Sequence, residues 1–261
     1  MTDIVGPKWV EKVEPANPET LFILPLGATE QHGPHLPLET DSIIARGICD
    51  RLLPMLPKEA DIRILPVEQI GYSLEHMDHE GSQTLTFDEA VNRWVGIGES
   101  IAQAGGRKLL MMNAHGGNSP LMTIVAQELR VRHNLLAVAT SWTRCIKGTR
   151  IVSPAEEAFG IHGGEIETAV MLSLAPQKVD MKRAMDFPNL QEALALDYKH
   201  LRAYGPHAFG WKAADLNRFG VTGRAGVATR ETGEALLSQA TAGLTELVAE
   251  IMDFNLPCWE G

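Results

Sequence analysis

The chain has 261 residues and a formal net charge of −10, from 23 Lys and Arg residues and 33 Asp and Glu residues. This length allows one large α/β domain or two small ones, and the hydrophobic fraction of 44% is sufficient for a substantial core. The sequence contains no run of five basic residues, so it argues against a nucleic-acid partner. No apolar stretch approaches the roughly 20 residues that span a bilayer, so we expect no membrane segment.

Short apolar segments alternate with longer amphipathic ones along the chain. In order, the sequence predicts a strand at 21–26, a helix at 43–53, a strand at 62–67, a helix at 86–105, a strand at 108–112, a helix at 119–133, a strand at 135–140, and helices at 164–174 and 231–253. This alternation is typical of an α/β fold in which a mostly parallel sheet carries helices on both faces. The segment 176–230 is poorly periodic, and we expect a lid or a subunit contact there.

The cysteines Cys49, Cys145 and Cys258 are odd in number and show no CxxC spacing, which argues against a disulfide framework or a zinc ribbon. The first residues lack a basic segment followed by an apolar one, so we expect no signal peptide. These observations predict a cytoplasmic protein.

The first polar motif, Glu30 and His32, directly follows the first predicted strand, where ligands bind in parallel α/β sheets. Residues two apart in an extended segment point to the same side, and Asp41 at the start of the next helix can return a carboxylate to them. The alternatives are an ordinary polar loop for the first pair and a helix N-cap for Asp41. The three together favour a metal site.

The second motif is Asn113-Ala114-His115-Gly116-Gly117-Asn118, a turn from strand to helix. Gly116 and Gly117 permit positive φ and close ligand approach, and their N–H groups are candidates for binding a substrate oxyanion. The alternative is a helix-entry turn in which His115 satisfies local backbone groups.

The third motif, His162 to Glu167, opens a helix. Because His162 and Glu165 are three residues apart, we expect them on one helix face. Glu167 should then point elsewhere and support a ligand without binding metal itself. Alternatively, both glutamates merely complement the helix dipole.

Carboxylates and imidazoles gathered from three segments suit Zn²⁺ or Mn²⁺, which accept both oxygen and nitrogen ligands. The sequence therefore predicts a site for two divalent metal ions. Two further residues are candidates for the substrate pocket. His76 either lines the pocket or binds metal, and Trp142 either walls the pocket or belongs to the core.

Segments 26–37 with Asp41, 113–118 and 162–168 resemble the creatininase family. The resemblance implies a single domain over 1–261, a three-layer α/β/α sandwich, usually assembled as a homohexamer. It implies two divalent ions, Zn²⁺ or Mn²⁺, one held by Glu30, Asp41 and His115. The other would be held by His32, the shared Asp41 and a further carboxylate. His162 matches the family's catalytic histidine, and Trp142 matches a tryptophan beside the substrate pocket.

One departure from creatininase itself concerns the further carboxylate, which lies there two residues after the histidine of the second motif. This chain has Gly117 at that position, and we expect Glu165 to supply the missing oxygen. Creatinine is therefore an uncertain substrate. Relatives with the Gly-Gly form act on formamidopyrimidine nucleotides, peptide-like intermediates or cyclic sugar ketones.

The sequence thus predicts a metal-dependent amidohydrolase that cleaves a C–N bond of a small-molecule amide or cyclic amide. His162 would carry the proton to the leaving nitrogen. One alternative is metal-assisted C–C cleavage of a cyclic polyol ketone. A non-catalytic binding partner is disfavoured, because such a protein has no need of the proton shuttle at His162.

Overall fold

The structure, a computed structural model, describes residues 13–256, so Cys258 and both ends of the expected domain lie outside the described residues. Its centre is a parallel four-stranded sheet of order β2-β1-β3-β4. The strands are β1 (Leu21–Leu26), β2 (Ile62–Ile64), β3 (Lys108–Asn113) and β4 (Leu136–Ser141).

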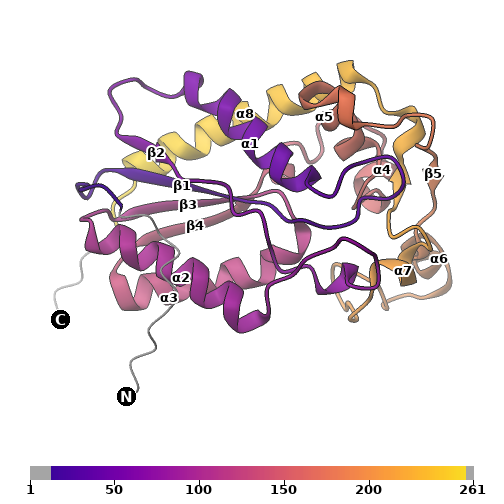
Figure 1. The fold of residues 1–261 in the computed structure, drawn as a ribbon, viewed down its shortest axis with the longest axis horizontal. Helices are drawn as coiled ribbons and strands as arrows, with labels where there is room; N and C mark the ends of the chain where they lie inside the picture. Colours follow the sequence, from indigo (N-terminus) through magenta and orange to yellow (C-terminus); the bar gives the residue numbers. More distant parts are fainter. Residues whose placement is uncertain (1–12, 257–261) are drawn as a thin grey trace.

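Helices cover both faces of this sheet (Figure 1). One layer comprises α1 (Thr40–Leu52), α5 (Glu165–Leu174) and α8 (Arg230–Asp253), and the other comprises α2 (Phe87–Gln103) and α3 (Ser119–His133). Each layer has its own apolar cluster against the sheet. The expected α/β/α sandwich is confirmed. None of the described helices combines the length and the apolar character that crossing a membrane requires.

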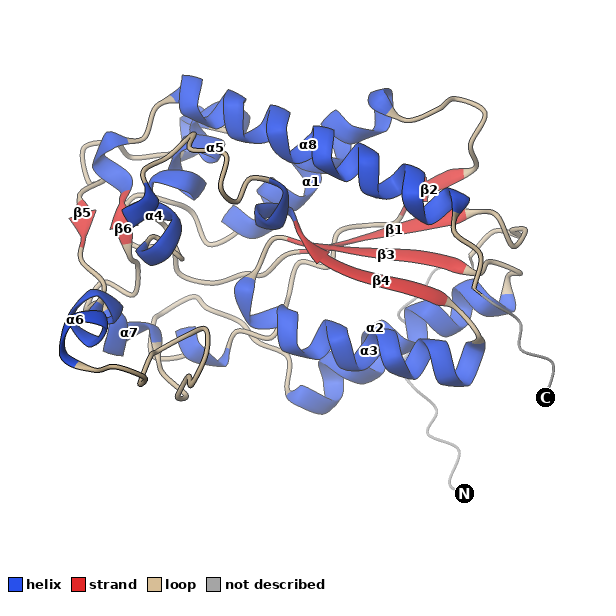
Figure 2. Ribbon diagram, turned by 180° about the vertical axis from the view of Figure 1, so that it is seen from behind, coloured by secondary structure: helices blue, strands red, loops and turns tan. Residues whose placement is uncertain are grey.

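The segment expected to be a lid or subunit contact forms short elements at one end of the molecule (Figure 2). These are β5 (Asp186–Phe187), α6 (Leu190–Asp197), α7 (Ala213–Leu216) and β6 (Gly223–Arg224), with α4 (Pro154–Phe159) beside them. β5 and β6 pair antiparallel. Elements this short have too few turns or alternations to give a periodic signal, which is why the sequence did not reveal them.

Local signals account for most element boundaries. Thr86 caps α2, because its hydroxyl accepts the N–H of Glu89 while the Glu89 carboxylate accepts the N–H of Thr86. The second strand is shorter than the expected 62–67. The N–H of Leu65 still donates to the carbonyl of Ile23, but Pro25 of β1 has no N–H to donate to β2 in return. The chain nevertheless stays beside β1, where the N–H of Glu68 donates to the carbonyl of Pro25 at 3.0 Å.

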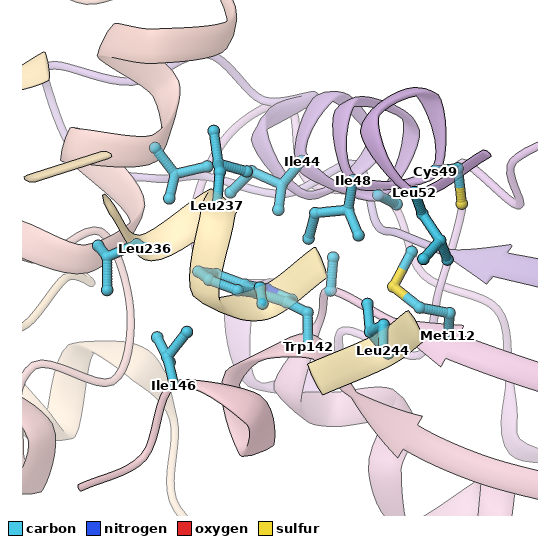
Figure 3. Packing of buried hydrophobic residues seen from close by; sticks show 14 of the residues in the cluster. Ile44, Ile48, Cys49, Leu52, Met112, Trp142, Ile146, Leu236, Leu237 and Leu244 are labelled. Carbon is cyan, nitrogen blue, oxygen red and sulfur yellow. The ribbon is translucent and has the colours of Figure 1, made fainter. Parts of the chain in front are cut away.

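Trp142 follows β4 and is 1% exposed. Its indole packs in the apolar cluster between the sheet and the α1 and α8 layer, near Ile44 and Leu237 (Figure 3). The structure therefore places Trp142 in the hydrophobic core. The alternative reading of this tryptophan is the one that the packing supports.

Replacing Trp142 with Ala should lower the free energy of unfolding by about 3–5 kcal/mol, because it leaves a cavity in the core. Denaturant unfolding measures this loss. The milder Trp142→Phe variant should keep the KM of the folded protein unchanged. A raised KM without a loss of stability would contradict the core assignment.

Candidate metal centre

Glu30 lies at the carboxyl end of β1 and is fully buried. Its Oε1 is 3.1 Å from Nδ1 of His115 and 3.4 Å from Nε2 of His76. Nδ1 of His162 lies 3.6 Å from the same oxygen. Burial opposes ionisation of Glu30, but the charges of His115 and His76 outweigh it and lower the pKa well below its usual value.

Asp41 occupies the first turn of α1 and is 1% exposed. Its Oδ1 lies 3.2 Å from Nε2 of His32, and its Oδ2 lies 3.5 Å from Nδ1 of His115. Burial raises the pKa of Asp41. The carboxylate thus stands between two histidines that come from different strand ends, as a bridging ligand would.

Glu167 lies with His32 and Asp41 in one group of candidate ligands. Its Oε2 lies 3.7 Å from Nε2 of His32 and accepts the N–H of Gly163 at 2.7 Å. Burial raises the pKa of Glu167 to about 7, although the charge of His32 opposes the rise. Glu167 is therefore aimed at the site.

The geometry brings Glu167, and not Glu165, beside His32 and Asp41, so we infer that the expected roles of the two glutamates are reversed. The expectation applied helical spacing to His162, which precedes the predicted helix 164–174. In the structure α5 begins at Glu165 with Gly164 as its N-cap, so His162 lies outside the helix. Glu167 is then at the third helical position, from which a glutamate reaches back over the N-terminus. The Glu165 carboxylate belongs to none of the candidate metal groups among the described residues, and its backbone N–H is bound by Glu156.

The described residues contain three groups whose ligand atoms lie within 4.8 Å of one another. They are Glu30 with Asp41 and His115, His32 with Asp41 and Glu167, and Glu30 with His32 and His162. The first two share Asp41, which is the arrangement expected of a two-metal site.

Unpaired oxygens support a cation at this position. Both oxygens of Glu30 and Oδ2 of Asp41 are buried and have no hydrogen-bond donor among the described residues. Leaving buried carboxylate oxygens unpaired is costly, whereas coordination of a cation satisfies them. The donor set of carboxylates and imidazoles fits Zn²⁺ or Mn²⁺.

His115 is oriented by its far ring nitrogen. Nε2 lies 2.9 Å from the carbonyl of Tyr72 and 3.2 Å from Oγ of Ser73. With an ion bound, donation of Nε2–H to that carbonyl would leave the lone pair of Nδ1 free to bind the ion beside Glu30.

His162 has a similar arrangement with a different electrostatic outcome. Its Nε2–H donates to the carbonyl of Gln31 at 2.8 Å, so Nδ1 faces Glu30 with its lone pair. Burial, helped by the charges of His32 and His76, lowers the pKa of His162 well below its usual value. A neutral imidazole can accept a proton at Nδ1.

His76 belongs to the same cluster and is 3% exposed. The side-chain amide of Gln31 donates both to Nδ1 of His76 at 2.9 Å and to the carbonyl of Gly220 at 2.6 Å. An ion pair of 2.8 Å between Lys212 and Asp78 joins the same two regions. The segment 176–230 is thus attached to the loop that carries His76.

Gly116 and Gly117 open a short 3₁₀ helix, Gly116–Asn118, and neither has a positive φ. What requires glycine at 117 is close approach, since a Cβ there would lie 2.3 Å from the carbonyl oxygen of Tyr72. It would also lie 2.6 Å from the Glu75 carboxylate, which stands 3.8 Å from Nε2 of His115. Glu75 was not among the site residues predicted from the sequence, which included only His76 from that loop.

A sequence profile of the family described as Creatininase: Creatinine amidohydrolase matches residues 8–248. The chain belongs to the creatininase family. The creatinine amidohydrolase of Pseudomonas putida is 26% identical over 249 residues, which are 89% of this chain and 90% of that protein. A mycofactocin precursor peptide peptidase of Mycobacterium tuberculosis is 32% identical over 169 residues, 62% of this chain and 61% of that protein.

A crystal structure of a creatininase matches the fold with a TM-score of 0.73 at 25% identity, covering 91% of this chain and 92% of that chain. Other solved creatininases are a Zn-Zn type and a manganese form. This family member is therefore similar to amidohydrolases that have been solved with the metals expected from the sequence.

The reversal of the two glutamates is testable with a matched pair of variants. Glu167→Gln removes a carboxylate from the group formed with His32 and Asp41, so we expect it to lose the ion held there. Glu165→Gln should retain the full metal content. Elemental analysis of both purified proteins gives the answer, and metal loss in the Glu165 variant alone would reject the assignment.

Proposed function

We propose that this chain is a metal-dependent amidohydrolase that cleaves a C–N bond of a small amide or cyclic amide at a centre of two divalent ions. The observation that carries the proposal is the shared carboxylate of Asp41 between two candidate ligand groups. Membership of the creatininase family supports the hydrolase class.

One ion would be held by Glu30, Asp41 and His115, and the other by His32, Asp41 and Glu167. When bound, Zn²⁺ or Mn²⁺ supplies Lewis acidity that polarises a substrate carbonyl and makes water more acidic. All of these ligand side chains belong to this chain, and all of them except the partly exposed Glu167 are buried.

His162 would take a proton from the attacking water and deliver it to the leaving nitrogen. Its neutral imidazole accepts at Nδ1 while Nε2–H remains on the carbonyl of Gln31, which fixes the ring orientation. The proton then passes to the leaving nitrogen, so that the amine departs neutral. Gly116 and Gly117 are the first residues of a short 3₁₀ helix, so their N–H groups have no acceptor within that helix. We propose that these N–H groups stabilise the oxyanion.

The substrate is proposed to differ from creatinine. Creatininase has a carboxylate residue at the position of Gly117. In this chain such a residue does not fit, because its Cβ would clash with the backbone carbonyl of Tyr72. The carboxylate beside His32 and Asp41 is instead that of Glu167, so we propose that different residues line the path of the substrate to the centre than in creatininase. A peptide amide is the second candidate, favoured by the 32% identity to a peptidase over 169 residues.

Elemental analysis of the purified protein, paired with turnover of creatinine, other cyclic amides, formamides and short peptides, tests the proposal. About two metal ions per chain with turnover of any amide supports a dinuclear amidohydrolase. Two ions without amide turnover would replace amide hydrolysis by another metal-assisted reaction, such as C–C cleavage of a cyclic polyol ketone. No bound metal after reconstitution would overturn the proposal.

Replacing His162 with Ala should reduce kcat by about 10²–10⁴-fold while metal content stays unchanged, as expected of a general acid and base. His133→Ala, on the end of α3, serves as the control and should change neither. Parallel loss of metal and activity in the His162 variant would make this histidine a ligand instead, as its grouping with Glu30 and His32 allows.

A further inference from the structure

A buried carboxylate outside the candidate metal groups joins two distant segments of the chain. Glu156, in α4, is 1% exposed. Its Oε1 accepts the backbone N–H of Glu165 at 2.7 Å, and its Oε2 accepts the backbone N–H of Arg224 at 2.8 Å. Hydrogen bonds of this length to a carboxylate are of the stronger, charge-assisted kind.

Glycines leave the space that this carboxylate fills. A Cβ at Gly160 would lie 2.1 Å from Oε1 of Glu156, and one at Gly164 would lie 2.3 Å from it. At Gly223, whose φ is +116°, the corresponding distance is 2.8 Å. Three glycines in the two segments 160–165 and 222–224 therefore close around one side chain, and a Cβ at any of them would crowd its carboxylate.

The two segments that Glu156 joins also pair with each other at the site. The N–H of Thr222 donates to the carbonyl of His162 at 2.8 Å, and the N–H of Ile161 lies 3.3 Å from Oγ1 of Thr222. One residue further, the N–H of Gly163 binds the Glu167 carboxylate. The backbone held by Glu156 is thus the backbone that carries His162 and Glu167.

We infer that Glu156 is a positioning residue, which holds segment 160–165 against 222–224 and thereby aims His162 and Glu167 at the metal centre. This inference rests on the proposed function, because it assigns Glu156 an effect on one of the two proposed ions. Glu30, Asp41 and His115 lie on other elements, outside the two segments that Glu156 joins.

The isosteric Glu156→Gln variant removes the charge with little change in shape. A carboxylate accepts with both oxygens, whereas a Gln side chain turns an NH₂ group toward one of the two N–H donors. We expect the ion held through Glu167 to bind about 10–100-fold more weakly, a loss typical of residues that orient ligands. The ion held by Glu30, Asp41 and His115 should keep its affinity.

Stepwise removal of zinc from the loaded, full-length protein by a chelator measures both affinities. Gly160→Ala is made alongside, because its Cβ displaces the Glu156 carboxylate without removing it, and it should show the same selective loss. Asp61→Asn is the control. Asp61 accepts a hydrogen bond of 2.7 Å from Thr20 at the opposite end of the sheet, so this variant should lower stability without changing either affinity.

The outcomes separate the two claims. Wild-type protein that binds no zinc contradicts the proposed function itself. A second outcome is that the wild type binds two ions and a folded Glu156→Gln or Gly160→Ala variant holds both as tightly as the wild type does. That result would overturn the positioning role alone. Equal weakening of both ions would also overturn it, since it would show a general structural effect.

Discussion

The structure depends on two buried carboxylates at the carboxyl edge of the sheet that the protein does not itself satisfy. Three of the four oxygens of Glu30 and Asp41 have no hydrogen-bond donor among the described residues. Burying such groups is unfavourable unless a counter-charge is present. Nearby imidazoles supply part of this counter-charge, and a divalent cation would supply the rest while coordinating the unpaired oxygens. The fold thus brings together buried carboxylates and imidazoles that fit a divalent cation.

The parallel sheet explains how ligands far apart in sequence meet. β1 and β3 are neighbours in the sheet, so the residues that follow them emerge side by side, and α1 returns Asp41 to the same edge. The other half of the site has no strand beneath it. His162 and Glu167 are held by pairing with Thr222 and by the buried Glu156. The two halves therefore rest on different kinds of support, a rigid sheet edge and a hydrogen-bonded loop.

Much of this could be predicted from the sequence, because buried strands and capped helices leave strong local patterns. That Glu30 and His115 lie close together could be expected, because each follows such a strand. The choice between Glu165 and Glu167 required the first residue of α5, which spacing alone does not give. Trp142 at a strand end is compatible with core or pocket, and only packing decides. The homohexamer and the cytoplasmic location stay predictions.

The central claim is that two divalent ions share Asp41. X-ray data recorded at the zinc absorption edge, from crystals of zinc-loaded protein, test it most directly. The account predicts an anomalous peak bounded by Glu30, Asp41 and His115, and another bounded by His32, Asp41 and Glu167. The absence of a peak from either position, or zinc bound only elsewhere on the molecule, would contradict it.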